Sequence, residues 1–185
     1  RGIGLAIGLR AARDGANVVV AAKTTARHPK LPGTIHSAAE EMEAAGGKAA
    51  AITIDVAKSD EITAMLDFAE ATYGGFDVLY NNAAVQTSGR LVDCTEDDWD
   101  RTIATNLDAV FWACRAALPA MLEGDRGSII NTASVLGLIG SEGYVAYGAA
   151  KAGLVALTRQ IAVEYGPSVR ANVIAPGSID TPRSR

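Results

Sequence analysis

Hydrophobic and polar positions change along the chain in blocks of two kinds. Short apolar runs without a helical period predict buried strands. They are expected at residues 17–22, 49–54, 77–80, 127–131 and 170–174. Longer blocks, with apolar residues three and four positions apart, predict helices. These are expected at residues 5–13, 35–45, 59–73, 95–122 and 144–164.

The segments between these blocks carry the residues that begin and end helices. Gly15 and the pair Gly46-Gly47 follow the first two helical patterns, as glycine commonly does at a helix end. Ser59 and Thr95 are candidate N-caps for the third and fourth helices. Pro119 is expected to kink or end the last turn of the long helix, because proline removes a backbone donor.

Strand and helix alternate with short turns, which is typical of parallel strands joined by right-handed crossovers. We therefore predict a single α/β domain over residues 1–185, a doubly wound parallel sheet with helices on both faces. Ligands bind such sheets at the carboxyl ends of the strands. Candidate chemistry is expected there.

Composition excludes several classes of protein. The net charge is −4 with both signs interspersed, which argues against nucleic-acid binding. No apolar run is long enough to cross a bilayer, so no membrane partner is expected. Cys94 and Cys114 have neither metal-type nor redox-type spacing, which predicts reduced thiols, no metal site and a cytoplasmic location.

The segment 134–151 carries the strongest candidate chemistry. Tyr147 lies thirteen positions after Ser134, and Lys151 lies one helical turn beyond Tyr147. A phenol normally titrates near pH ~10, and a neighbouring ammonium lowers its pKa by favouring the phenolate. With Ser134 holding a substrate oxygen beside the phenol, this set predicts proton transfer to a carbonyl or from an alcohol.

A second group of residues indicates a nucleotide site. Gly2 and Gly4 open a helix, as the last two glycines of a dinucleotide fingerprint do, although an ordinary glycine turn is the alternative. Ala22-Lys23 stands where an NAD site carries an acid, and Arg1 precedes the glycines. The cations Arg1 and Lys23, without an acid at this strand end, favour NADP(H) over NAD(H). The alternative is that Lys23 is only solvated. Asp55 is placed to accept from the adenine amino group or to cap a helix.

Together these residues resemble the short-chain dehydrogenase/reductase family over nearly the whole chain. The matching parts are RGIG (1–4), Asp55-Val56, NNAA (81–84), Asn106, Ser134, YGAAK (147–151) and PGSIDT (176–181). The resemblance implies that Tyr147 is the acid/base, that Lys151 lowers its pKa and binds the nicotinamide ribose, and that Ser134 orients the carbonyl. It further implies that Asn106 holds a water in the proton relay.

The resemblance also implies a set of cofactor contacts. Asn82 would lie beside the adenosine half, and residues from Pro176 to Thr181 would line the nicotinamide and its phosphate. The full set is Arg1, Gly2, Ile3, Gly4, Lys23, Asp55, Val56, Asn82, Ala83, Tyr147, Lys151, Pro176, Gly177, Ile179 and Thr181.

Several alternatives stay open. Asn106 is expected either to serve the relay or to bond to backbone across a helix kink, and Ser134 is either catalytic or a turn residue. Tyr144 is a second phenol, but Gly148 stands four positions on in place of a lysine. The loop 24–34 is longer than is usual in the family and is expected to be solvated, with Arg27 or Lys30 within reach of a 2′-phosphate.

The chain begins at Arg1 in a glycine-rich turn, and we expect it to be an excerpt that lacks the first and last strands of the sheet. Because the first strand is normally central, residues 1–185 alone are not expected to be stable and active. Ala84 stands where the family usually has glycine, which adds a methyl near the cofactor. This change is expected to be tolerated.

The expected function is that of an NADP(H)-dependent oxidoreductase interconverting a ketone or aldehyde and an alcohol, both small molecules. The alternatives are a 3-oxoacyl thioester reductase of the same family and a non-catalytic nucleotide-binding member. Helices 95–122 and 144–164 are expected to pair across subunits of a homodimer or homotetramer, or else only to line the core. The apolar residues behind that expectation are Leu107, Val110, Phe111, Cys114, Leu118, Leu154, Leu157 and Ile161.

Overall fold

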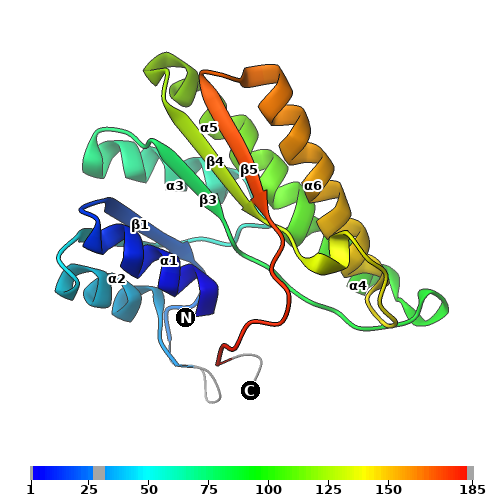
Figure 1. Ribbon diagram of the computed structural model, residues 1–185. Coiled ribbons are helices and arrows are strands. Elements are labelled where there is room, and N and C mark those ends of the chain that lie inside the picture. The colour runs from blue at the N-terminus through cyan, green and yellow to red at the C-terminus, as the bar shows by residue number, and fades with distance from the viewer. Residues whose placement is uncertain (1, 27–31, 183–185) are drawn as a thin grey trace. The chain divides into compact units, whose positions relative to one another are not determined.

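The computed structural model describes residues 2–26 and 32–182, and Figure 1 shows strands and helices alternating along them. The strands are β1 (Asn17–Ala22), β2 (Lys48–Thr53), β3 (Val78–Asn81), β4 (Gly127–Thr132) and β5 (Val169–Ile174). The helices are α1 (Gly2–Arg13), α2 (Ile35–Ala44), α3 (Ser59–Tyr73), α4 (Glu96–Ile103), α5 (Ala109–Gly124) and α6 (Val145–Tyr165). This is the α/β fold of parallel strands and helices that the sequence pattern predicts.

The chain forms two compact units. The first takes in residues 1–55, 64–75 and 178–185, and the second takes in residues 56–63 and 76–177. The strands form two parallel sheets, β1-β2 in the first unit and β3-β4-β5 in the second, where the sequence pattern predicts a single sheet. The hydrophobic pattern defines each strand but carries no information about which strands pair, so this difference lay beyond it.

In the first unit, α1 and α2 pack closely beside the two strands. A Cβ built on Gly8 of α1 would lie 2.1 Å from Cε of Met42 in α2, so glycine permits this approach. A capping box begins α2, in which Thr34 Oγ1 accepts from the Ser37 N–H at 3.1 Å and Ser37 Oγ accepts from the Thr34 N–H at 2.9 Å. Both strands are half-buried, because each has a single strand neighbour in this sheet.

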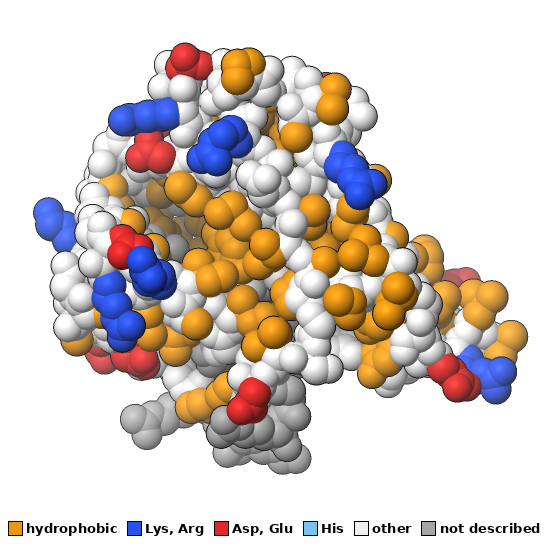
Figure 2. Space-filling view, viewed as in Figure 1, with side chains coloured by type: hydrophobic (Ala, Val, Ile, Leu, Met, Phe, Trp, Pro, Cys, Tyr) orange, Lys and Arg blue, Asp and Glu red, His pale blue; other side chains and the backbone are white. Residues whose placement is uncertain are grey.

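In the second unit, α5 and α6 cover one face of the three-stranded sheet (Figure 1). The central strand β4 is buried along nearly its whole length, with Ile129 fully enclosed. Ala117 of α5 and Ala150 of α6 are also fully buried, and such small side chains let the helices lie close to the sheet. The opposite face carries exposed apolar positions: Val78 and Ile174 are 56% and 38% exposed, and Figure 2 shows hydrophobic side chains gathered over this face.

The helix predicted over residues 95–122 consists of three segments. Thr95 caps α4 as predicted, accepting from the Asp98 N–H at 3.1 Å. A π-helical turn, Ala104–Asp108, then joins α4 to α5. Pro119 lies inside α5, which continues to Gly124, so of the two predicted effects proline does not end this helix, and a kink in its last turn stays a prediction. One more turn forms because the residues after the proline still bury apolar side chains, Met121 among them.

Most of the apolar residues on which the predicted subunit contact depends are buried within this chain. The buried ones are Val110, Cys114, Leu118, Leu154 and Ile161. Phe111 remains 42% exposed, and its neighbour Trp112, which is not among the predicted contact residues, is 39% exposed. Among the described residues, no helix is both long enough and apolar enough to span a bilayer.

Candidate active site

Ser134 lies two residues after the last residue of β4, at the carboxyl end of the central strand. Its backbone is extended, and its side chain caps the 3₁₀ turn Val135–Gly137, with Oγ accepting from the Leu136 N–H at 3.2 Å. Ser134 is therefore a turn residue, as one alternative proposed. Because its oxygen serves as the acceptor in this turn, the hydroxyl proton is available for donation to a bound oxygen.

Tyr147 and Lys151 lie in the first two turns of α6. The Lys151 Nζ is 5.6 Å from the centroid of the Tyr147 ring, close enough for the ammonium to act on the phenol electrostatically. Lys151 is only 2% exposed, and its Nζ donates to the backbone carbonyl of Thr132 in β4 at 2.8 Å. This bond ties the lysine to the strand that delivers Ser134.

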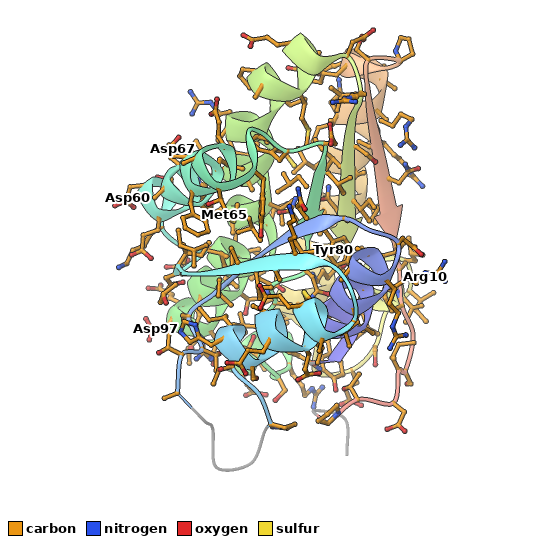
Figure 3. The ribbon with its side chains drawn as sticks, turned by 90° about the vertical axis from the view of Figure 1, so that its left-hand side faces the viewer. Arg10, Asp60, Met65, Asp67, Tyr80 and Asp97 are labelled. Carbon is orange, nitrogen blue, oxygen red and sulfur yellow. The ribbon has the colours of Figure 1, made fainter. Side chains whose placement is uncertain are left out.

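Burial changes the acidity of the lysine. Desolvation lowers the pKa of Lys151 from 10.5 to about 8. At neutral pH the side chain is still mostly the ammonium, the form that stabilises a neighbouring phenolate. Tyr80 of β3, labelled in Figure 3, contrasts with this site: burial raises the pKa of its phenol, which accepts from the Thr132 hydroxyl at 2.9 Å.

Two glycines allow the Ser134 turn to pack directly against α6. A Cβ on Gly137 would lie 2.7 Å from the carbonyl carbon of Lys151, and a Cβ on Gly148 would lie 3.1 Å from the Leu136 carbonyl oxygen. No larger residue fits at Gly137 without moving backbone. Sequence reasoning gave these glycines no role, although Gly148 inside a helix costs about 1 kcal/mol relative to alanine and so calls for a packing reason.

Asn106 lies in the π-helical turn and is completely buried. Its Nδ2 donates to the carbonyl oxygens of Val85 at 2.8 Å and Thr102 at 2.9 Å, so the amide bonds to backbone, as one alternative predicted. Its Oδ1 is buried and has no hydrogen-bond partner among the described residues. Such an orphan acceptor is costly unless a donor such as water reaches it, so the amide also fits the predicted water-holding role.

Pro176 and Gly177 lie beside the Ser134 turn, because β4 and β5 end together. The Pro176 carbonyl accepts from the Val135 N–H at 3.1 Å, and a Cβ on Gly177 would lie 3.9 Å from Val135 Cγ1. At the end of β3, Asn82 is half-buried and Ala83 is exposed. These residues share the edge of the sheet that carries Ser134.

In the first unit, Gly2 begins α1 with φ +64°, a left-handed conformation that favours glycine. A Cβ at this position would lie 3.8 Å from the Thr181 side chain, so the two predicted phosphate residues are neighbours. Ile3 and Gly4 form the first turn of the same helix. Arg1 lies outside the described residues, as do Arg27 and Lys30 of the long loop.

Lys23 and Asp55, predicted to contact different parts of the cofactor, contact each other. The Lys23 Nζ lies 3.1 Å from Asp55 Oδ2 at the carboxyl ends of β1 and β2. The lysine side chain is 69% exposed. A pair this exposed is worth roughly 0–1 kcal/mol, so a phosphate can compete for the ammonium.

The remaining predicted cofactor contacts are Val56 and Ile179. Val56 follows β2 and is half-buried, whereas Ile179 is 47% exposed. Both cysteines are free thiols, and burial raises the pKa of Cys114 to about 12, which leaves it unreactive. Among the described residues, no cluster of three or more His, Cys, Asp and Glu side chains is arranged to hold a metal ion.

The family model for short chain dehydrogenases matches residues 1–185. The chain belongs to the short-chain dehydrogenase family. Hydroxysteroid dehydrogenase-like protein 2 from Danio rerio is 40% identical over 179 residues, and its Homo sapiens counterpart is 37% identical over 178. Each alignment covers 95% of this chain but 43% of the relative, so the chain spans less than half the length of these curated relatives.

Two solved structures show the same fold. A short-chain dehydrogenase/reductase from Burkholderia xenovorans superposes with a TM-score of 0.90 at 33% identity, covering 98% of this chain and 68% of that one. A short chain dehydrogenase from Mycobacterium smegmatis gives a TM-score of 0.88 at 34% identity, with 96% and 72% covered. Short-chain dehydrogenases are, as a family, oxidoreductases that use an NAD(P) nucleotide.

The residues of this short-chain dehydrogenase fit such a nucleotide. Gly2 opens a twelve-residue helix whose N-terminal N–H groups favour an anion, and its left-handed backbone has no Cβ in the way. Lys23 adds an exposed cation at the end of β1. In the second unit, the buried unpaired Oδ1 of Asn106 and the enclosed Lys151 are polar groups that a catalytic site uses and a plain core does not.

Proposed function

We propose that the protein is an NADP(H)-dependent short-chain oxidoreductase that interconverts a ketone or aldehyde and an alcohol. The observation that carries this proposal is the buried Lys151 ammonium 5.6 Å from the Tyr147 ring, on a helix packed against the Ser134 turn. The arrangement provides an acid/base, a cation that tunes it and a hydroxyl donor. These are the groups that a carbonyl reduction requires from the protein.

Four side chains take part in the proposed reaction. The bound nicotinamide would supply or accept the hydride. In the reducing direction, Tyr147 gives its proton to the substrate oxygen while the Ser134 hydroxyl donates a hydrogen bond to the same atom. The Lys151 ammonium then stabilises the phenolate that Tyr147 becomes, and it also binds the nicotinamide ribose. Asn106 holds a water through which the phenolate regains a proton.

The preference for NADP(H) rests on Lys23. β1 ends in Ala22-Lys23, without the acid that would bind the ribose hydroxyls of NAD, and an ammonium at this place favours a 2′-phosphate. Binding of the phosphate would replace the Lys23–Asp55 ion pair. Asp55 is assigned to the adenine amino group as a hydrogen-bond acceptor, and Asn82 is assigned to the adenosine half. The pyrophosphate is assigned to Gly2 and Thr181.

The buried lysine argues against a non-catalytic nucleotide-binding protein. Desolvating an ammonium destabilises a fold, and a pKa lowered to about 8 is the measure of that penalty. A protein that only sensed nucleotide gains nothing from keeping such a group beside Tyr147. An enzyme gains a tuned acid/base.

The experiment is a panel of carbonyls and alcohols assayed with NADPH and NADH at the nicotinamide absorbance. The panel includes hydroxysteroids and their ketones, since relatives carry the name hydroxysteroid dehydrogenase-like. 3-Oxoacyl thioesters are added as the alternative substrates. Turnover of at least one carbonyl, faster with NADPH, supports the proposal. Nucleotide binding without turnover of any member would favour the non-catalytic alternative.

We also propose a cytoplasmic homodimer or homotetramer. Its contact uses the outer face of α5, where Phe111 and Trp112 are exposed and Arg115 lies 5.5 Å from the Trp112 ring. The two free thiols fit a reducing compartment such as the cytoplasm. Light scattering of the wild type and of Trp112→Glu tests the contact, since a charge at a buried interface would dissociate the subunits.

A further inference from the structure

A chain of side-chain hydrogen bonds, part-buried at Asn81 and buried beyond it, runs from the sheet to α6, apart from the acid/base residues. Asn81 Nδ2 of β3 donates to Asn131 Oδ1 of β4 at 2.8 Å. Asn131 Nδ2 donates to Thr158 Oγ1 of α6 at 2.9 Å, and Thr158 donates to the Leu154 carbonyl at 2.7 Å. Asn131 is fully buried and Thr158 is 2% exposed.

Donors and acceptors can be arranged in only one order along these hydrogen bonds. The single hydroxyl proton of Thr158 goes to the Leu154 carbonyl, so Thr158 must accept from Asn131. The amide nitrogen of Asn131 therefore faces Thr158, and its oxygen faces Asn81. Every member has one arrangement that satisfies it, and a one-residue change of helix register would leave buried polar groups without partners.

The chain joins the same strand and the same helix as the active-site lysine. Asn131 precedes Thr132, whose carbonyl accepts from Lys151 Nζ at 2.8 Å. Thr158 lies seven residues, two turns, after Lys151 and so shares its face of α6. Helix α6 is thereby fixed to β4 at two points, one of them the lysine itself.

We propose that Asn131 and Thr158 are positioning residues, which hold α6 at the register that places the Lys151 ammonium against the Thr132 carbonyl of β4. Neither side chain touches substrate or cofactor; both act through the lysine. The inference rests on the proposed function for its catalytic consequence. Its structural content concerns Lys151 alone and is measured without turnover.

The test follows the titration of Lys151 by NMR of protein labelled at the lysine side chains, with Lys151→Met to assign the signal. Thr158→Val keeps the shape of threonine and removes the hydroxyl, whereas Thr158→Ser keeps the hydroxyl. Ile161→Val is the matched control, because it removes a buried methyl group from the same helix without touching the hydrogen-bond chain. The Tm of each variant records its loss of stability.

We expect Thr158→Val to raise the pKa of Lys151 by about half a pH unit or more, because a displaced ammonium is better solvated. Thr158→Ser and Ile161→Val should titrate like the wild type. An unchanged Lys151 titration in Thr158→Val, or an equal shift in Ile161→Val, would overturn the proposal. Should Thr158→Val fail to fold, Thr158→Ala against Val155→Ala makes the same comparison.

Kinetics separate this inference from the proposed function. With a substrate in hand, Thr158→Val should lower kcat about tenfold, as a small displacement of a catalytic group does, and Thr158→Ser should restore it. If the wild type turned over no carbonyl, the proposed function would fail while the lysine titration still decided the positioning role. If turnover depended on Tyr147 but Thr158→Val matched the wild type in kcat and in titration, only the positioning role would fail.

Discussion

The burial of Lys151 destabilises the folded protein, and the residue also provides the charge that the proposed mechanism needs. An ammonium that is 2% exposed, with the Thr132 carbonyl as hydrogen-bond partner, is desolvated, and its pKa falls to about 8. Below that pH the folded protein holds the charge at a penalty. In the proposed mechanism, this charge beside Tyr147 favours the phenolate. Because Lys151 is buried, its titration also changes the unfolding free energy with pH, and this change can be measured.

The pH dependence of stability has a definite sign. Between pH 8 and 10.5 the unfolded lysine is protonated and the folded one is largely neutral, so the unfolded state binds more protons and stability rises with pH. Relative to Lys151→Met, the wild type should gain roughly 3 kcal/mol of unfolding free energy across that range, at 1.36 kcal/mol per pH unit. Denaturant unfolding of both proteins at several pH values measures it. A difference that stays constant with pH would contradict the burial of a titrating ammonium.

Lys23 offers a second test at the scale of one residue. Lys23→Asp places an acid at the end of β1, removes the partner of Asp55 and repels a 2′-phosphate. The ratio of kcat/KM for NADPH to that for NADH should fall about tenfold or more, since roughly 1.4 kcal/mol separates tenfold steps. Lys48→Asp makes the same charge change at the other end of the paired strands and should leave the ratio unaltered. A parent enzyme without cofactor preference would remove the role assigned to Lys23.

At the scale of elements, the site depends on how a turn and a helix pack. The Ser134 turn rests on the first turns of α6 because Gly137 lets its backbone approach that of Lys151. The approach is backbone against backbone, so no side-chain rotation can relieve a clash there. The relative position of the serine and the tyrosine helix is therefore fixed by a residue without a functional group.

Gly137→Ala tests this contact. Its methyl would lie 2.7 Å from the Lys151 carbonyl carbon, so the turn and helix must separate. We expect a loss of about 1–3 kcal/mol in unfolding free energy and a fall in kcat, because overpacking forces backbone shifts. Gly140→Ala, three residues on in the same loop with nothing within 4 Å of its Cβ, is the control and should change neither quantity. Equal unfolding free energy and equal kcat in the two variants would show that this contact does not fix the position of the turn.

At the scale of the whole molecule, the hydrophobic pattern predicted strands and helices well. β1 has the predicted bounds, Asn17–Ala22, and α6 differs by one residue at each end. Periodicity and turn residues are local, and they suffice for elements whose apolar faces are continuous. The pattern did not show the π-helical turn at Asn106, because the same residues satisfy an α-helical period.

Contacts between residues far apart in the sequence could not be predicted from local patterns. The ion pair of Lys23 with Asp55 joins positions 32 apart, and the Asn81–Asn131 bond joins positions 50 apart; both follow from parallel register, which no local signal encodes. Phe111 was predicted to be available for a subunit contact and is exposed, whereas Cys114 on the same helix is buried. Which side of α5 faces the sheet depends on packing, and an all-round apolar helix leaves it undetermined.

The direct test of the account is the turnover of Tyr147→Phe. The variant removes one oxygen and keeps the ring beside Lys151. We expect carbonyl reduction to fall by about 10²–10⁴-fold, the usual contribution of a positioned acid/base, while NADPH binding measured by fluorescence stays near that of the wild type. Tyr144→Phe, the matched change three residues earlier, should leave turnover nearly intact. Wild-type turnover in Tyr147→Phe would contradict the proposed mechanism.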